Sequence, residues 1–226
     1  MKINRNHLWP EGLYHHDRVP KSLLVLHHTA GHGGKAALDY LRKTASKTMR
    51  EKGYAVGTAY VIEREGTIFQ AFDDRDWAYH SASGKANDMR SIGIELDNIG
   101  FLHKRGDQFF DLYGYNNSKL VGNNKVTVYD NGSKWRGYQY FEEYYDEQVD
   151  SLIELCEDIF KRHPTIPRKI PKDFFPEKQW PWWKHHNFKG VLAHIHFLGP
   201  QSKWDTSIAF KKHFDKFVES LNLEVV

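Results

Sequence analysis

The apolar positions of the chain first indicate strands. The segment "LLVLHHTAG", Leu23 to Gly31, is an apolar run that ends in two adjacent histidines, as a buried strand would. The runs "TAYVIE" and "TIFQAF" flank Arg64-Glu65-Gly66, whose glycine suits a tight turn. Two later segments, "SIGIEL" and "KGVLAHIHFLG", have the same β-rich character. The pattern therefore predicts a hairpin and three further strands.

Other segments carry helical signals. Helix formers fill "KAALDYLRKTASKTMREKG", which ends at Gly53, apolar residues recur with helical spacing from Asp146 to His163, and a last helix is expected from about Thr206. Residues from about 100 to 140 hold only short β-like pieces and indicate an elaborated loop or hairpin insertion. Because strands alternate with helices and the hairpin adds an antiparallel pair, we expect an α/β fold. We expect it to form one domain, residues 1–226, with a mixed central β-sheet flanked by α-helices.

Composition and charge narrow the class of protein. The 226 residues carry a formal charge of +3 and a pI of about 8.7, which suits an anionic polymer but lacks a basic stripe for nucleic acid. The single cysteine, Cys156, excludes an intrachain disulfide. The N-terminal residues lack the apolar core of a secretory signal, and no stretch is apolar enough to span a bilayer. We therefore expect a monomer, made in the cytoplasm, that binds neither nucleic acid nor membrane.

The histidines of the predicted strands form a candidate site. Successive strand side chains point to opposite faces, so His27 and His28 cannot both belong to a common site. The same alternation places His194 and His196 on one face of the last strand, and Asp205 follows eleven residues after His194. Two histidines and one carboxylate are the ligands of an open catalytic zinc site. Because the chain has 14 histidines, hydrogen-bonded histidines at strand ends remain the alternative interpretation.

Five landmarks occur in the order found in one enzyme family. They are "VLHHTAG", "YVIEREGTIFQ", "DWAYHSA", "SIGIEL" and "LAHIHFLGPQSKWD". From about Leu23 to Asp205 the chain resembles the zinc-dependent N-acetylmuramoyl-L-alanine amidases. These are bacterial muramyl amidases and phage amidases whose fold is shared with the peptidoglycan-recognition proteins. The resemblance implies that fold and a Zn²⁺ cofactor.

The resemblance also implies a role for each matching residue. His27, His194 and Asp205 correspond to the zinc ligands. Glu95 corresponds to the catalytic glutamate, and Lys203 to the lysine two residues before the third ligand. Amide hydrolysis needs a nucleophilic water, stabilisation of a tetrahedral oxyanion and a proton for the leaving amine. Zinc, Glu95 and Lys203 can supply these three functions.

The chain departs from the family at several positions. Thr58 stands where some members carry a catalytic tyrosine, and Ala193 stands where the family often has glycine. The stretch from His194 to Asp205 is about one residue longer than usual. This leaves His196 as a rival to His194 for the metal, although the resemblance favours His194.

Two aromatic segments are candidates for substrate contacts. Trp77 and His80, in "DWAYHSA", could line a peptide groove near the metal or pack over the sheet edge. The segment "QWPWWKHH" could form a platform for sugar rings from Trp180, Trp182 and Trp183. A packed cluster is the favoured interpretation, because exposing three tryptophans without a ligand is unfavourable.

The sequence thus predicts a hydrolase that cleaves the amide bond between N-acetylmuramic acid and L-alanine in peptidoglycan or muropeptides. The alternatives are a non-catalytic peptidoglycan-binding module on the same fold and a zinc peptidase that cuts within the stem peptide. The complete ligand set and Glu95 favour an enzyme over a binding module, which needs neither metal nor base. Such an enzyme would degrade the cell wall after release or injection, as a bacteriolytic phage endolysin or an effector, or would act in cytoplasmic recycling.

Overall fold

The structure, a computed structural model, describes residues 2–31, 33–111, 126–129, 133–199 and 204–226. Its centre is a mixed sheet built from β1 (Ile3–Asn4), β2 (Leu23–His28), β3 (Tyr60–Ile62), β4 (Ile68–Gln70), β5 (Ser91–Leu96) and β11 (Gly190–Ala193). The strand order is β1-β4-β3-β5-β2-β11. The hairpin β3–β4 is antiparallel, and the other neighbouring pairs in this sheet are parallel.

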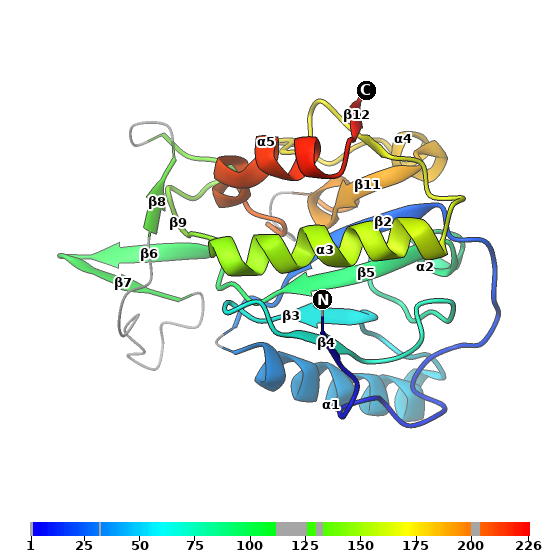
Figure 1. Cartoon of the computed structure of the whole chain (residues 1–226). Helices are drawn as coiled ribbons and strands as arrows, with labels where there is room; N and C mark the ends of the chain where they lie inside the picture. The colour runs from blue at the N-terminus through cyan, green and yellow to red at the C-terminus, as the bar shows by residue number, and fades with distance from the viewer. Residues whose placement is uncertain (1, 32, 112–125, 130–132, 200–203) are drawn as a thin grey trace.

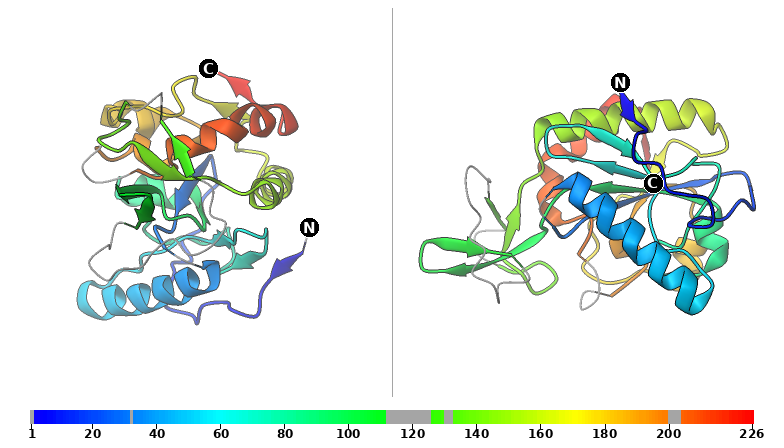
Figure 2. Two further views of the ribbon diagram at one scale, coloured as in Figure 1. Left: turned by 90° about the vertical axis from the view of Figure 1, so that its left-hand side faces the viewer. Right: turned by 90° about the horizontal axis from the view of Figure 1, so that it is seen from below.

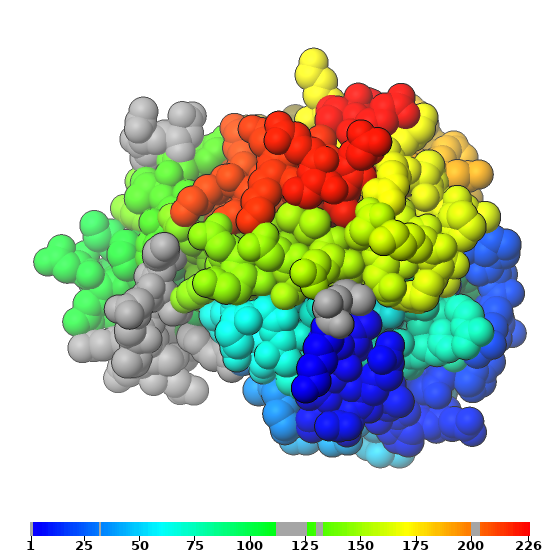
Figure 3. Space-filling view, in the orientation of Figure 1, coloured from blue at the N-terminus to red at the C-terminus, as the bar shows by residue number. Residues whose placement is uncertain are grey.

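Helices cover both sides of this sheet. Helix α1 (Gly34–Lys52) lies on one side, and α3 (Asp146–Arg162) and α5 (Lys211–Ser220) lie on the other (Figure 1; Figure 2). Figure 3 shows the side chains of α3 and α5 packed side by side over their face. The shorter helices are α2 (Lys85–Met89) and α4 (Trp182–Asn187). The predicted mixed sheet flanked by helices is confirmed. Among the described helices, none has the length and apolar character that a membrane span requires.

Two glycines that the sequence places at element ends take the conformation expected of them. Gly53 ends α1 with a φ of 72°, and its N–H donates to the Met49 carbonyl. Gly66 turns the β3–β4 hairpin with a φ of 84°. A Cβ at Gly66 would lie 2.7 Å from the Glu147 carbonyl oxygen, so the hairpin turn also packs closely against α3. These local signals explain why the helix and the hairpin are predictable from sequence.

Alternation along β2 divides its side chains between two cores. Leu24 and Leu26 belong to the large core that also contains the apolar residues of α3 and α5. Leu23 and Val25 pack on the opposite face with Trp180 and other apolar side chains. Since His27 continues the second set, it emerges on the face that Trp180 covers.

The three tryptophans of the segment "QWPWWKHH" differ in their exposure to solvent. Trp180 is buried, whereas Trp182 and Trp183, on α4, are 70% and 56% exposed. The favoured interpretation of a packed cluster therefore holds for Trp180 only.

The predicted insertion at about 100–140 contributes a sheet of its own. Its strands are β6 (Phe101–Arg105), β7 (Gln108–Phe110), β8 (Val126–Val128) and β9 (Tyr140–Glu142), in the order β7-β6-β9-β8. This sheet extends beyond the carboxyl end of β5 (Figure 1). Sequence analysis missed β6 and β7, because β6 has two buried residues followed by three exposed ones rather than an alternating pattern. A smaller sheet pairs β10 (Lys169–Ile170) with β12 (Glu224–Val225).

The last strand of the main sheet is shorter than predicted. β11 ends at Ala193, and His194–His196 form a 3₁₀ turn. The expectation that His194 and His196 share a strand face is therefore wrong, because residues two apart on a 3₁₀ turn point in different directions. The Arg136 guanidinium holds this turn by donating to the carbonyls of Ile195 and Leu198, at 3.0 and 3.2 Å.

Candidate metal centre

Glu95, His27 and His194 come from three neighbouring strands at their carboxyl ends. In the parallel register of β5 and β2, Glu95 lies opposite His27. In the register of β2 and β11, Leu26 lies opposite Ala193, so His194 begins its turn beside His27. Opposed residues of neighbouring strands point to the same face, and open sheets bind ligands outside the carboxyl ends of parallel strands. The topology therefore assembles these residues where an α/β fold usually carries its site.

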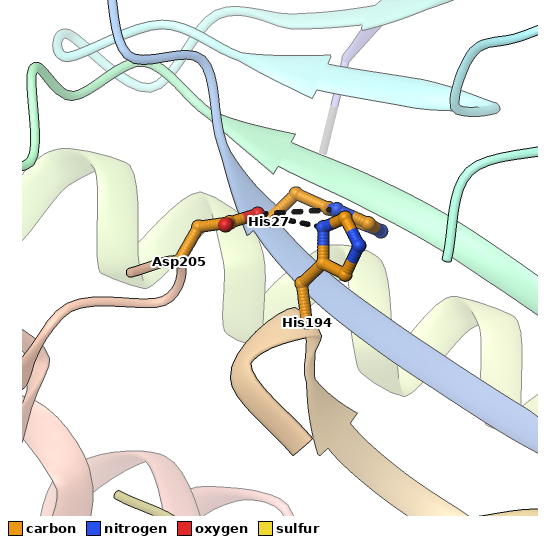
Figure 4. Close-up of side chains that lie close together, drawn as sticks. All are labelled: His27, His194 and Asp205. Carbon is orange, nitrogen blue, oxygen red and sulfur yellow. Dashed lines mark hydrogen bonds and ion pairs between the residues drawn. The ribbon is translucent and has the colours of Figure 1, made fainter. Parts of the chain in front are cut away.

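The side chains of His27, His194 and Asp205 point toward one another (Figure 4). Asp205 Oδ2 lies 3.3 Å from His27 Nδ1 and 2.9 Å from His194 Nδ1. One possible ligand atom from each residue lies within 4.8 Å of the other two, and all three residues are buried. The Asp205 carbonyl accepts a hydrogen bond from the Ile195 N–H at 2.8 Å, which fastens its loop to the turn that carries His194.

The hydrogen bonding of His194 shows that this set suits a cation. His194 Nε2 lies 3.1 Å from the Ser81 carbonyl oxygen, which can only accept, so Nε2 carries the hydrogen. Neutral His194 then presents its Nδ1 lone pair to the Asp205 carboxylate, which repels it unless a proton or a cation lies between them. Ligands about 2.0–2.1 Å from a tetrahedral zinc ion are roughly 3.3 Å apart. These separations and the donor types both fit Zn²⁺.

Of the predicted substrate residues, Trp77 is buried and His80 is half-buried, with a side chain that is 4% exposed. The Trp77 ring stacks on His15, with 4.3 Å between ring centroids. His80 Nδ1 lies 2.9 Å from His27 Nε2, and His80 Nε2 lies 2.8 Å from Ser91 Oγ. Burial lowers the pKa of His80 to about 3, so its ring is neutral. Substrate contact by either residue stays a prediction, and the contact of His80 with His27 is one that no sequence motif indicated.

The remaining histidines of these segments lie apart from His27, His194 and Asp205. His28 points to the other side of the sheet, where its Nδ1 lies 3.1 Å from Tyr144 Oη. His196 is buried against the Trp180 ring, and its Nδ1 donates to the Ala193 carbonyl at 2.8 Å. Burial lowers the pKa of His196 to about 4. The geometry therefore gives His196 no place among the grouped ligand atoms.

Of the predicted catalytic residues, Glu95 lies in the main sheet, on β5. Glu95 is buried between His27 on β2 and Val61 on β3. Lys203 lies outside the described residues, so its role stays a prediction. Thr58, at the position of the family's tyrosine, is buried and donates to the Tyr60 carbonyl at 3.3 Å. Its hydroxyl is thus engaged by the backbone of β3, two residues further along the chain.

The family model described as N-acetylmuramoyl-L-alanine amidase matches residues 17–206, which include the grouped residues His27, His194 and Asp205, and Glu95. The chain belongs to this amidase family. Comparison with curated protein sequences finds no match.

Solved structures show the amidase-family fold over nearly the whole chain. The amidase LysC from Clostridium intestinale is similar with a TM-score of 0.51, 13% identity and 99% coverage of both chains. AmpD has a TM-score of 0.52 and 18% identity, covering 96% of this chain and 99% of its own. PlyL has a TM-score of 0.53 and 9% identity, covering 98% of this chain and 97% of its own. At such identities the likeness supports the fold alone.

Proposed function

We propose that this member of the amidase family is a zinc-dependent hydrolase that cleaves the amide bond between N-acetylmuramic acid and L-alanine in peptidoglycan or muropeptides. The convergence of His27, His194 and Asp205 at the strand ends is the observation that carries the proposal. Glu95, on the adjacent strand and the same face, supplies the base that hydrolysis requires. A module that only binds peptidoglycan would need neither of these features.

The three ligands would hold the metal with one position left for substrate or water. Zinc so held supplies Lewis-acid chemistry, because it lowers the pKa of water to roughly 7 and polarises the scissile carbonyl. Two neutral imidazoles and a single carboxylate cancel only one of its two positive charges, which preserves that electrophilic character. The burial of His27, His194 and Asp205 limits the access of other water molecules and strengthens charge interactions inside the site.

Glu95 performs the proton transfers in this mechanism. Its carboxylate takes a proton from the attacking water and gives it to the nitrogen of the departing L-alanine amine. The parallel register fixes the Glu95 backbone beside that of His27, so base and metal ligand approach the same bond from adjacent strands. Lys203, two residues before Asp205, is proposed to stabilise the oxyanion.

Zinc content and zinc removal test the cofactor. We expect one zinc ion per chain, loss of activity in excess chelator, and recovery when Zn²⁺ is added back. Removal should also lower the melting temperature, because a ligand that binds only the folded state stabilises it. Metal analysis, activity assays and thermal unfolding of the same preparation give all three results. A protein that contains no metal and keeps full activity in chelator contradicts the proposal.

The products of digestion test which bond is cut. Digested peptidoglycan should contain a new α-amine on L-alanine, while the glycan chains stay intact. Mass spectrometry and end-group analysis measure both, with a heat-inactivated sample as control. New reducing sugars without alanine amines would point to a glycosidase, and a new amine on a later stem residue would assign the activity to a peptidase. Parallel assays on intact sacculi and on muropeptides separate a wall-degrading lysin or effector from a recycling enzyme.

A further inference from the structure

We propose that the dipeptide His80-Ser81 is a positioning unit that fixes which ring nitrogen carries the hydrogen in both metal-binding histidines. His80 Nδ1 faces His27 Nε2 at 2.9 Å, and the Ser81 carbonyl faces His194 Nε2 at 3.1 Å. Both histidines are thereby engaged through Nε2, and both direct Nδ1 toward Asp205. The inference rests on the metal site of the proposed function and extends it to residues outside the ligand set.

Hydrogen-bond donors around His80 determine the direction of its bond to His27. The Ser91 hydroxyl donates to the Asp88 carbonyl at 3.2 Å, so Ser91 Oγ accepts from His80 Nε2 at 2.8 Å. His80 Nε2 therefore carries the hydrogen, and His80 Nδ1 must accept. Consequently His27 Nε2 donates to His80, and the Nδ1 lone pair of His27 faces the metal position. The reverse arrangement would take the only hydroxyl hydrogen of Ser91 away from the Asp88 carbonyl.

The dipeptide is held by a buried carboxylate from α2. Asp88 Oδ1 accepts from the Ser81 N–H at 2.9 Å, from the Ser81 hydroxyl at 2.6 Å and from the His80 N–H at 3.3 Å. Asp88 itself is fully buried. Its three acceptor contacts fix the backbone of both residues, so the Ser81 carbonyl and the His80 ring have defined positions.

The His80 ring lies in a space that glycine provides on β5. A Cβ at Gly93 would lie 3.0 Å from His80 Nδ1 and 2.8 Å from the Thr58 methyl group. Any larger residue at Gly93 would displace the ring or Thr58. The ring is thus fixed against the strand that also carries Glu95, within hydrogen-bond distance of His27.

Substitutions at His80 test this positioning role. His80→Leu removes the acceptor for His27 Nε2 and should weaken zinc binding about 10–100-fold, the usual effect of losing a hydrogen-bond partner of a metal ligand. His80→Asn places an amide oxygen near the position of Nδ1 and should restore most of that affinity. His185→Leu, which replaces a buried histidine on α4, is the matched control and should bind zinc like the wild type. Competition with a chromogenic chelator measures the affinities, and thermal unfolding verifies that each variant is folded.

Nitrogen NMR of the metal-free wild type gives a second, independent readout. The His27 ring should carry its hydrogen on Nε2 before any metal is added. Hydrogen on His27 Nδ1 with none on Nε2, or a folded His80→Leu variant with wild-type zinc affinity, overturns the inference. Equal losses of affinity in folded Leu and Asn variants also overturn it. If the wild type binds no zinc, the proposed function fails instead, so the two failures are distinguishable.

Discussion

Glu95→Gln is expected to lower turnover about 10²–10⁴-fold, the usual contribution of a positioned general acid or base. Glutamine preserves the size of the side chain but cannot accept the proton of the attacking water. Zinc content should stay unchanged, because the grouped ligand atoms belong to His27, His194 and Asp205. The measurement is the rate of muropeptide hydrolysis together with the zinc bound per chain.

Glu65→Gln is the matched control, since Glu65 is exposed in the β3–β4 turn. This variant should keep both activity and zinc. A Glu95→Gln protein with a near-normal rate would move the base to another residue. If zinc content falls as much as the rate does, Glu95 would instead be a metal ligand or a residue that positions one.

His194→Ala is expected to lose its bound zinc, whereas His196→Ala is expected to keep it. His194→Ala removes one of the three grouped ligands and should abolish stoichiometric zinc and activity. His196→Ala should keep its zinc, because the His196 ring packs against Trp180 and Phe174 away from that group. It should lose stability instead, since truncating a buried ring leaves a cavity.

Metal analysis after gel filtration and thermal unfolding of both variants test this expectation. The opposite pattern, with zinc lost in His196→Ala and kept in His194→Ala, would assign the metal to His196. The second ligand would then be His196, and the extra residue would lie upstream of that ligand instead of between His194 and Asp205.

The elements that sequence analysis predicted are those with strong local signals. β2 has an unbroken apolar run, the β3–β4 turn has Gly66, and α1 ends at a left-handed Gly53. β6 and the end of β11 have no such signal. β6 follows no alternating pattern, and β11 ends at Ala193 although the apolar and polar pattern continues through Phe197. There tertiary contacts, including the Arg136 hydrogen bonds to the turn, determine the backbone.

The candidate site was predictable only in part. The resemblance to the amidases implied His27, His194 and Asp205 as the metal ligands. The structure brings these three residues together. Strand alternation gave the wrong relation between His194 and His196, because the chain leaves the strand at Ala193. His80 lies 53 residues after His27, and their contact depends on a loop that folds back over Gly93. No local sequence pattern records such a long-range approach.

The position of β2 between β5 and β11 determines when the metal centre can form during synthesis. His194 follows His27 by 167 residues, so the β2–β11 pairing closes a long loop, which is a slow and non-local step of folding. During translation, His27 and Glu95 emerge from the ribosome long before His194 and Asp205 do. Until then the chain holds only one of the three proposed metal ligands, His27, beside Glu95. Under the proposed function, the hydrolase stays inactive during synthesis until the segment that carries His194 and Asp205 has emerged and β11 has paired with β2.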